Sequence, residues 1–591
     1  MSEQLDKSPI QDISALHPIV MLVLGLGIGV IAGFGAVLFR MMIGFAHNLL
    51  FFGRVNLFYE ANLHTLKSPW GIGIILVPVL GVIVVTWITK TFAPEAKGHG
   101  VPEVIDAIYF KEGKIRPSVV IFKSIASAIT IGSGGSVGRE GPIIQIGSAF
   151  GSTVGQWIKM PIRQRIILIA AGAGAGIAAT FNAPIGGIAF AVELLLVSIN
   201  AATLAVVAIS TISAAYIGRQ FIGIYPAFNI PLLAVSDSTS TPLIDLVLML
   251  PFGIVIGCAS ALFVRILYWV EDQFHRIPLN EYLRNMFGML MLGIIFYTFM
   301  ETTGHYHLEG IGYSTIVDVL SGVIKHPWFL LLLYFAKLIS TSITLGSGGS
   351  GGVFSPALFM GATLGAAFGE FAHLYFPHLA ISPVMFAVAG MAGMVGGATG
   401  AVLTAIIMLF EMTRDYNVIL PVILTVTVAY MTRVMISRES IYTLKLLRRG
   451  RSIHEGLQAA ISSGQIAQDV MTQNYKVVAK SQIEQAPSMV ETALSNNVAV
   501  VVEENGTIIG LLKAGADLRK LDAMIIKDFV TVTPHTGLIR ILRKMRLYQV
   551  KTVFVTRKPR SSLAEDLIGV ITPNEVTEMA SQTALLMNEA I

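Results

Sequence analysis

Gly132-Ser-Gly-Gly-Ser-Val-Gly-Arg-Glu-Gly-Pro142 recurs in the second half of the chain as Gly346-Ser-Gly-Gly-Ser-Gly-Gly-Val-Phe-Ser-Pro356. The correspondence continues downstream, because Asn182 to Glu193 matches Gly400 to Glu411 at nearly the same offset. Repetition over such a distance predicts two homologous halves, roughly residues 18–222 and 243–437. Halves whose apolar segments are interrupted by glycine and proline at matching positions are typical of a transport site near the middle of a membrane.

Composition indicates that the chain up to about residue 450 is a membrane domain. Of 591 residues, 54% are hydrophobic and only 13% are charged, with a mean hydropathy of +0.71, whereas soluble domains carry about a quarter charged residues. Four uncharged stretches approach the roughly 20 residues that cross a bilayer as a helix: 19–39, 71–89, 246–264 and 417–432. We therefore expect an all-α, multi-pass integral membrane protein whose first apolar segment is retained.

Charge and cysteine content narrow the possible partners. The single cysteine, Cys258, allows no intrachain disulfide, and we expect no metal because cysteine-rich zinc patterns are absent from the sequence. The net charge of +5 does not predict nucleic-acid binding, because the clearest basic cluster follows the last apolar segment: Lys445, Arg448, Arg449 and Arg451. By the positive-inside rule this end is cytoplasmic, and we expect both termini on that side.

A second domain is predicted over residues 451–591, where charges become frequent. Val498 to Val502 and Thr507 to Leu512 flank a hairpin signal at Glu504-Asn505-Gly506 and indicate two strands. Lys551 to Thr556 and Leu567 to Ile571 repeat this pair, with a helical pattern from Gly537 to Leu547 between them. The tail is therefore expected to hold two αβ units in tandem.

The two glycine-serine loops are suited to hold an anion. Each loop precedes an apolar run that starts at Pro142 or Pro356, and proline is favoured in the first turn of a helix. A helix N-terminus offers unpaired amides and partial positive charge. Two such ends from the two halves would bind an anion weakly enough to release it quickly. The alternative is that these glycines serve only close helix packing.

Glu140 is a carboxylate inside an apolar, glycine-rich segment, next to Arg139. Ionisable groups inside a membrane are costly and indicate function by default. At a helix N-terminus this carboxylate can occupy the anion site and leave it on protonation, which predicts a gate. The alternative is a structural ion pair with Arg139 or exposure at a helix end.

Two enzyme motifs also occur, Gly346-x-Gly-x-x-Gly351 and Gly134-x-Ser-x-Gly138. Both motifs need a preceding strand in an α/β sheet. No strand is predicted before either motif, so we expect no enzymatic activity.

These residues resemble the signatures of the chloride channel and transporter (CLC) family. Gly138-Arg-Glu-Gly-Pro142 is similar to its gating motif, which implies a gating role for Glu140 beside Arg139. Gly352-Val-Phe-Ser-Pro356 resembles a second anion motif, which implies that Gly352 and the amides of Val353 and Phe354 hold the ion. Tyr442 matches a tyrosine whose hydroxyl contacts the central anion.

The resemblance implies further features of the whole protein. It implies a homodimer in a lipid bilayer, with one anion path per subunit, inverted halves and chloride or another small inorganic anion as substrate. It also implies the inner membrane of a bacterium and a cytoplasmic pair of CBS units that can bind an adenine nucleotide. The nucleotide signature is degraded, and Thr572 and Glu575 are its best remaining contacts.

The first departure from the family is at Gly98-His-Gly-Val-Pro102, where His99 replaces the usual serine. A neutral imidazole can donate one hydrogen bond to the anion, and a protonated ring would add charge. Alternatively the ring turns away and the Gly100 backbone makes the contact. Chloride therefore cannot be separated from nitrate or another anion on these residues.

The second departure is Leu194, which follows Glu193 where family exchangers commonly carry a proton-accepting glutamate. An apolar residue holds no proton, so this position favours a chloride channel of the voltage-gated type. The close alternative is a chloride/proton antiporter with water or Glu193 as relay. A membrane receptor or sensor without anion flux is a more distant alternative.

Overall fold

The computed structural model describes residues 16–196, 199–221, 223, 243–378, 381–451, 466–485, 490, 492–494, 498–512, 524–559 and 561–576. Two compact units divide the chain, a helical unit of Ser14–Ser452 and a second unit that contains Ile453–Ile591.

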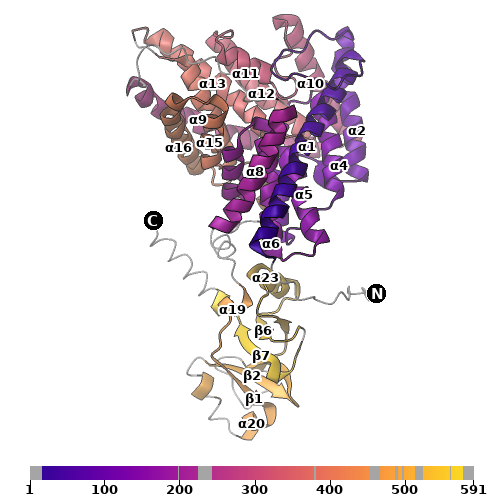
Figure 1. The fold of residues 1–591 in the computed structure, drawn as a ribbon, viewed down its shortest axis with the longest axis vertical. Coiled ribbons are helices and arrows are strands. Elements are labelled where there is room, and N and C mark those ends of the chain that lie inside the picture. Colours follow the sequence, from indigo (N-terminus) through magenta and orange to yellow (C-terminus); the bar gives the residue numbers. More distant parts are fainter. Residues whose placement is uncertain are drawn as a thin grey trace. The chain divides into compact units, whose positions relative to one another are not determined.

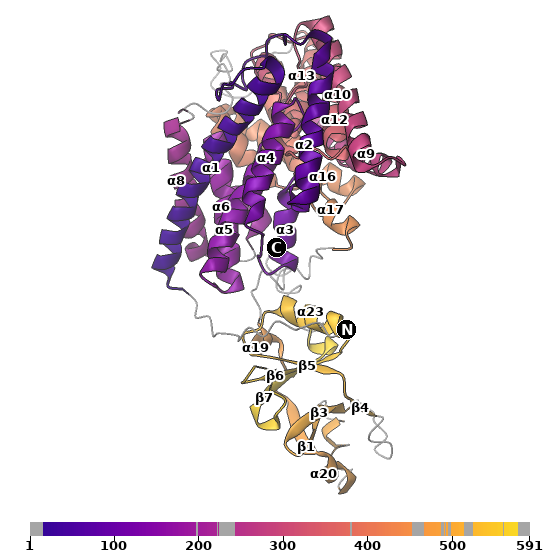
Figure 2. The same ribbon diagram turned by 90° about the vertical axis from the view of Figure 1, so that its right-hand side faces the viewer.

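The helical unit is built from helices, which fall into two sets in chain order (Figures 1 and 2). The first set comprises α1 (Pro18–Phe52), η1 (Gly71–Leu76), α2 (Val77–Thr91), α3 (Val101–Phe110), α4 (Ser118–Gly132), α5 (Glu140–Trp157), α6 (Ile162–Phe181), α7 (Pro184–Phe190), the π-helical η3 (Ala191–Leu195) and α8 (Ala201–Phe221). The second set comprises α9 (Leu243–Arg276), α10 (Glu281–Thr303), α11 (Tyr313–Leu320), α12 (Pro327–Gly346), α13 (Phe354–Tyr375), α14 (Pro383–Thr399), α15 (Val402–Thr413), α16 (Ile419–Ile436) and α17 (Thr443–Arg448). Helices α3 to α7 thus correspond in order to α11 to α15.

Within the described residues, nine helices are long and apolar enough to cross a membrane. The four apolar stretches predicted from the sequence lie in α1, in η1 with α2, in α9, and in η4 (Tyr416–Val418) with α16. The prediction of a multi-pass helical membrane protein is therefore confirmed.

Glycines set the packing distance between matching helix pairs in the two halves. A Cβ atom on Gly147 of α5 would lie 2.1 Å from the Gly172 carbonyl oxygen of α6. A Cβ on Gly361 of α13 would likewise lie 2.2 Å from the Gly390 carbonyl of α14. Any side chain at these positions would push the backbones apart, so the alternative reading of the glycines, helix packing, holds for these positions.

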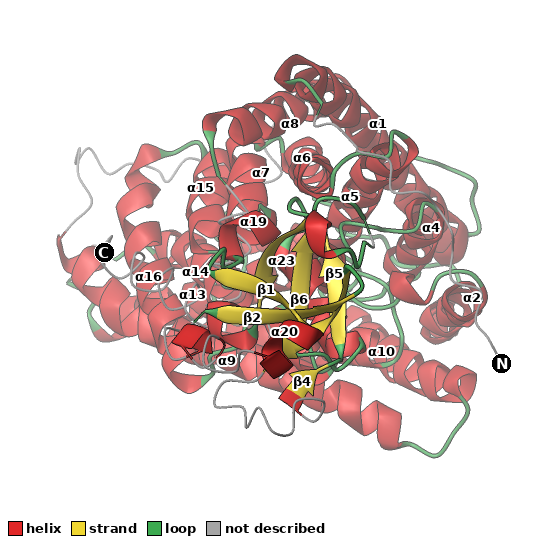
Figure 3. Cartoon of the chain, turned by 90° about the horizontal axis from the view of Figure 1, so that it is seen from below, coloured by secondary structure: helices red, strands yellow, loops and turns green. Residues whose placement is uncertain are grey.

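The second unit contains two small sheets, drawn in yellow in Figure 3. In the first sheet, β2 (Ala499–Glu504) pairs in parallel with β1 (Tyr475–Ala479) and antiparallel with β3 (Thr507–Leu512), which pairs with β4 (Ile525–Ile526). In the second sheet, β6 (Thr552–Thr556) pairs in parallel with β5 (Phe529–Val532) and antiparallel with β7 (Leu567–Ile571). The two sheets share one apolar cluster, Val501, Ile508, Leu511, Phe554, Leu567 and Val570. The predicted tandem strand pairs, and the helix α23 (Leu538–Leu547) between them, are confirmed.

Candidate functional site

The two glycine-serine loops meet each other through reciprocal hydrogen bonds. Gly138 N donates to the Gly352 carbonyl at 2.8 Å, and Gly352 N donates to the Gly138 carbonyl at 2.6 Å. The loops are also tied to the opposite half, because Ser136 N donates to Thr344 Oγ1 and Ser350 N donates to Thr130 Oγ1, both at 3.2 Å. This pairing brings the first turns of α5 and α13 together from the two halves.

Glu140 is the first residue of α5, and its carboxylate lies at the N-terminus of α13. Glu140 Oε1 accepts from the Tyr313 hydroxyl at 2.7 Å and from Ser355 Oγ at 2.5 Å. Its Oε2 is 3.4 Å from Ser355 N, in the first turn of α13. The side chain is 1% exposed, and three donors compensate the buried carboxylate.

The residues around this carboxylate include the predicted anion-binding amides. Val353 is the N-cap of α13 and Phe354 its first residue, and both are buried. The first amides of an α-helix have no partner within the helix, so these N–H groups are suited to a negative charge. A Cβ on Gly138 would lie 2.2 Å from Glu140 Oε2. That glycine makes room for the carboxylate.

Arg139 does not neutralise Glu140 directly. None of the ion pairs among the described residues joins the two side chains. The Arg139 guanidinium instead lies over the ring of Tyr313, 5.4 Å from its centroid. The alternative reading of Glu140 as a structural ion pair with Arg139 is therefore wrong.

The third predicted loop, around His99, joins the same junction. A Cβ on Gly141 would lie 2.2 Å from the His99 carbonyl oxygen and 2.9 Å from Gly352 Cα. A Cβ on Gly100 would lie 2.9 Å from the Gly141 carbonyl. Glycines at positions 100, 141 and 352 thus allow three backbone segments to converge, and Gly100, with φ +85°, is the N-cap of α3.

The side chain of His99 is committed to a partner in α9. The hydroxyl of Tyr268 donates to the Ile441 carbonyl, which can only accept. The contact of 3.2 Å between the same hydroxyl and His99 Nε2 therefore needs its hydrogen on Nε2. Nδ1 of the neutral ring then carries no hydrogen, and it is buried without a hydrogen-bond partner among the described residues.

This geometry corrects one expectation about His99. A neutral ring that gives its N–H to Tyr268 has no hydrogen bond left for an anion, so the expectation that a neutral His99 contacts the anion is wrong in this arrangement. The protonated ring and the Gly100 backbone remain as possible contacts. Tyr442 is 2% exposed and its ring centroid is 5.9 Å from that of His99, so the third anion motif lies beside the first.

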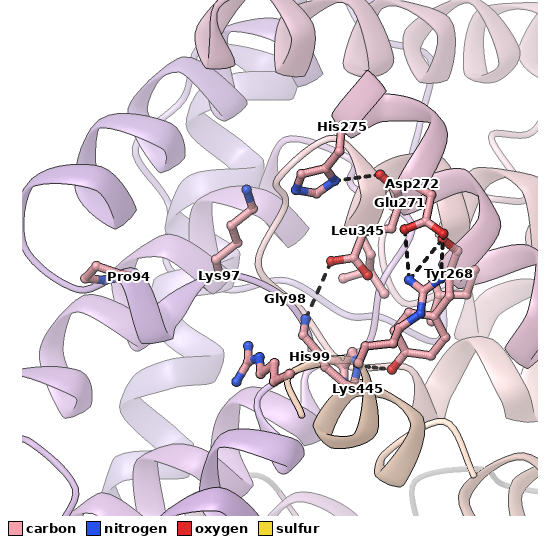
Figure 4. A pocket seen from close by; sticks show the side chains of 13 residues that line it. Pro94, Lys97, Gly98, His99, Tyr268, Glu271, Asp272, His275, Leu345 and Lys445 are labelled. Carbon is pink, nitrogen blue, oxygen red and sulfur yellow. Dashed lines mark hydrogen bonds and ion pairs between the residues drawn. The ribbon is translucent and has the colours of Figure 1, made fainter. Parts of the chain in front are cut away.

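A cavity of about 330 Å³ lies beside His99 and is lined by charged side chains (Figure 4). The predicted basic cluster contributes three of its residues, Lys445, Arg448 and Arg449. These cations have carboxylate partners: Arg448 binds Asp272 at 2.9 and 2.5 Å, and Arg449 binds Glu103 at 2.6 Å. The cavity therefore has a polar wall whose charges are largely balanced.

Two buried lysines at equivalent places hold the loops before α3 and α11. Lys123 of α4 donates to the carbonyls of Ala96 at 2.9 Å and Gly98 at 2.7 Å. Lys337 of α12 donates to the carbonyls of Leu308 and Gly310, both at 3.1 Å. Each lysine is fully buried. The internal repeat therefore extends to the cations that fix these loops.

Glu193 and Glu411, which match in the repeat, cap each other's helices. Glu193 accepts from Leu403 N at 2.9 Å, Thr404 N at 2.8 Å and Thr404 Oγ1 at 2.7 Å, all in the first turn of α15. Glu411 accepts from Ile185 N at 3.1 Å and Gly186 N at 2.7 Å, in the first turn of α7. Both carboxylates are thus helix caps, as the structural interpretation of Glu193 requires.

The predicted nucleotide contacts also have a local structural role. Glu575 Oε2 accepts from Thr572 N at 2.7 Å and from Thr572 Oγ1 at 2.5 Å. The bond from Thr572 N is the glutamate half of a capping box, and Thr572 Oγ1 accepts from Asn574 N at 3.3 Å. In the first of the two αβ units of the tail, the corresponding segment runs from Lys513 to Ala516 and lies outside the described residues.

Two site residues were missed by the sequence predictions, Tyr313 and Ser355. Ser355 lies inside the quoted motif, but its hydroxyl had been given no role. Tyr313 follows Gly310-Ile-Gly312, which is similar to Gly98-His-Gly100 before α3. That internal similarity was the signal that could have identified the loop before α11 as part of the site.

Comparison with known proteins identifies the class of this helical membrane protein. Residues 81–433, more than half of the chain, match the family described as voltage gated chloride channel. The chain is 30% identical over 450 residues to the H(+)/Cl(−) exchange transporter ClcA of Vibrio cholerae, covering 73% of this chain and 90% of that protein. The chain therefore belongs to the CLC family.

Solved structures agree with this assignment. A slow cyanobacterial Cl−/H+ antiporter matches with a TM-score of 0.63 and 28% identity, over 74% of this chain and 99% of that chain. A eukaryotic CLC transporter matches with a TM-score of 0.60 over 94% of this chain and 98% of that chain. Its 18% identity limits this second likeness to the fold. The predicted fold class, an all-α membrane domain with an inverted repeat, is confirmed.

Proposed function

We propose that this protein exchanges chloride, or a similar small anion, for protons across a bacterial inner membrane, with Glu140 as its gate. The observation that carries the proposal is the buried Glu140 carboxylate at the N-terminus of α13. A negative side chain occupies the place where unpaired helix amides would otherwise attract an anion. The carboxylate and the transported anion then compete for one position.

Protonation of Glu140 releases that position. A neutral carboxyl gains much less from the amide of Ser355 and from the two hydroxyl donors than a carboxylate does. The side chain then leaves, and an anion binds to the amides of Val353 and Phe354. On the other side of the site, Tyr442 and either the Gly100 backbone or a protonated His99 provide the next contacts.

The comparisons favour chloride/proton exchange, whereas Leu194 favours a chloride channel. The Vibrio cholerae relative is named an exchange transporter, and the cyanobacterial structure is that of an antiporter. Without a carboxyl group at position 194, and with Glu193 bound to α15, the proton reaches Glu140 through water. A channel is the second candidate, because Leu194 cannot carry a proton and the Glu193 carboxylate is bound to α15. No free titratable group then stands where family exchangers commonly carry a proton-accepting glutamate.

The test is proton movement driven by chloride in reconstituted vesicles. Vesicles loaded with chloride and weakly buffered are opened to chloride efflux, and external pH is followed with an electrode. We expect a sustained pH change that an uncoupler collapses. Chloride efflux without a pH change would establish the channel instead. Glu140→Gln is the matched control: it should retain anion flux and lose proton flux, because an amide neither binds the site as an anion nor carries a proton.

The assembly and the second unit complete the proposal. We propose a homodimer with both termini in the cytoplasm, and a C-terminal pair of CBS units, since two sheets of matching topology share one core. An adenine nucleotide would use Thr572 and Glu575. A ligand of the folded unit raises its melting temperature by mass action, so no shift with millimolar AMP, ADP or ATP would leave the unit a structural module.

A further inference from the structure

We propose that Tyr313 is a positioning residue that latches the gate: its hydroxyl, together with that of Ser355, holds the Glu140 carboxylate in the anion site. This inference rests on the proposed gating role of Glu140 and goes beyond it, because it assigns what sets the strength of closure. The Tyr313 hydroxyl donates to Glu140 Oε1 at 2.7 Å, and Tyr313 is 1% exposed. Hydrogen bonds to a charged group are stronger than bonds between neutral groups.

The loop before Tyr313 is fixed on both sides, so the hydroxyl is held in place. Lys337 donates to the Leu308 and Gly310 carbonyls, and Gly310 N donates to the Gly134 carbonyl at 3.3 Å. Gly312, with φ +81°, is the N-cap of α11, and a Cβ there would lie 2.9 Å from the Phe359 ring. The anchored backbone gives the tyrosine little freedom to follow Glu140 when the carboxyl leaves.

The latch belongs to one half of the repeat only. Gly98-His-Gly-Val101 before α3 corresponds to Gly310-Ile-Gly-Tyr313 before α11, and the lysines of α4 and α12 hold the two loops in the same way. Val101 stands where the second half has the tyrosine, and valine has no hydroxyl. The hydroxyl at position 313 is therefore an addition to the shared scaffold, placed against the half that carries the gate.

Removing the hydroxyl should favour the anion in its competition with the carboxylate. Chloride can bind at this place only after Glu140 leaves, so part of its binding energy is spent on breaking the latch. Tyr313→Phe keeps the ring and its contact with Arg139 but removes one charge-assisted hydrogen bond. We expect chloride to bind roughly tenfold more tightly. Ser355→Ala should act in the same direction.

The experiment is calorimetric titration of sodium chloride into the full-length protein in chloride-free detergent solution. Tyr313→Phe should tighten binding in the presence of Glu140 and change nothing in a Glu140→Ala background, where no carboxylate remains to be held. Tyr334→Phe is the matched control, because its hydroxyl in α12 is buried with no hydrogen-bond partner among the described residues. The Tyr334→Phe variant should bind chloride with the same affinity as the wild type.

Three results would overturn the latch. Unchanged affinity in Tyr313→Phe would show that the hydroxyl does not stabilise closure. Weaker binding, in either background, would make Tyr313 a ligand of the anion. Absence of chloride binding in the wild type and in Glu140→Ala alike would remove the anion site itself, and with it the proposed function. If either of the first two results occurred while vesicles still exchanged chloride for protons, only the latch would fail.

Discussion

His99 shows how one hydrogen bond decides what a side chain can offer. Because its Nε2–H is directed to Tyr268, the neutral ring has a bare Nδ1 and no donor for an anion. A serine hydroxyl at this position would supply one. We predict that His99→Ser tightens chloride binding by roughly threefold to tenfold at pH 8, where the ring is neutral. The measurement is chloride titration at pH 8.

The control for this prediction is Tyr268→Phe. It removes the hydroxyl that fixes the hydrogen on Nε2 of His99, so that either ring nitrogen can carry it. If the serine variant binds chloride as the wild type does, the anion is held there by the Gly100 backbone and not by the residue at position 99. Facing His99 are Tyr268, Tyr442, Lys123 and Lys445. Burial, and then the charges of Lys445, Lys123 and Arg449, lower the pKa of His99, which is why the test is made on its neutral form.

At this scale, the sequence predicts the residues that lie in motifs and misses those that act across them. Glu140 is predicted from its apolar, glycine-rich neighbours, whereas Val353 and Tyr442 are implied by the resemblance to the CLC family. The structure places Glu140 and Val353 together. Tyr313 reaches Glu140 from another helix, and no local pattern records such a contact. The tautomer of His99 depends on two further segments, so it could not be derived from residues 98–102 alone.

Helices α7 and α15 are joined by two carboxylates that cap each other's N-termini. Each bond pairs a negative charge with the positive end of a helix, a favourable arrangement in a partly buried place. We predict that Glu193→Gln and Glu411→Gln each destabilise the protein by about 1–2 kcal/mol, with the larger loss for Glu193→Gln because Glu193 accepts three hydrogen bonds and Glu411 accepts two. Thermal unfolding in detergent measures the effect.

The matched control for these caps is Glu60→Gln, whose partner Arg40 lies 3.3 Å away in an exposed pair. An exposed ion pair contributes little, so this variant should unfold like the wild type. If Glu193→Gln and Glu411→Gln melted at the same temperature as Glu60→Gln, the caps would contribute nothing measurable to stability.

The connection between α10 and α11 carries a histidine whose titration should affect stability. Burial, and then the neighbouring His64 and His305, lower the pKa of His307 to about 3. The unfolded chain has the ordinary value near 6.5 and binds the proton more readily. Stability from this group is therefore complete above about pH 6.5 and declines as the pH falls towards 3. The melting temperature should decrease over that range.

His307→Asn is the test variant for this segment, because asparagine can still bond to Thr315, which lies 3.0 Å from His307 Nδ1. The other titratable groups facing the ring are His64, His305 and, bound to His64 at 2.6 Å, Asp318. We expect the melting temperature of the variant to fall less than that of the wild type as the pH is lowered from 6.5 to 4.5. A parallel loss in both would assign the acid sensitivity to the other groups.

Hydropathy predicts the helices that face lipid better than those inside the protein. The four predicted stretches include α1 and α9, which expose large apolar side chains such as Phe34 and Trp269. Helix α14 is buried from Met385 to Thr399, and α5 begins with a buried carboxylate. Their glycines and polar residues serve packing and the site, so they lack the uniform apolar run on which the prediction depends.

For the whole molecule, the repeat is the feature that the sequence carries most fully. It predicts matching loops, and the structure adds matching lysines and matching caps. The differences between the halves matter most for transport, because they include Glu140, Tyr313 and Leu194. In the proposed mechanism, the duplicated scaffold supplies the anion path, and single residues that differ between the halves supply its gate and latch.

For the proposed exchange, the remaining question is how a proton reaches Glu140, and it can be tested at Leu194. Leu194 lies in the π-helical turn after α7, is partly buried and follows a glutamate that is bound to α15. Without a titratable group there, proton entry depends on water and should limit turnover. We predict that Leu194→Glu raises the rate of chloride-driven proton transport several-fold. A carboxyl group whose pKa lies near the operating pH speeds proton transfer.

The control is Leu194→Gln, whose side chain is similar in size and polarity to glutamate but has no proton to give, so it should not raise the rate. If the glutamate and glutamine variants both transport protons at the wild-type rate, proton entry does not limit exchange, and the water path is already sufficient. If both accelerate equally, hydration of the turn, and not a proton-carrying group, is what this position controls.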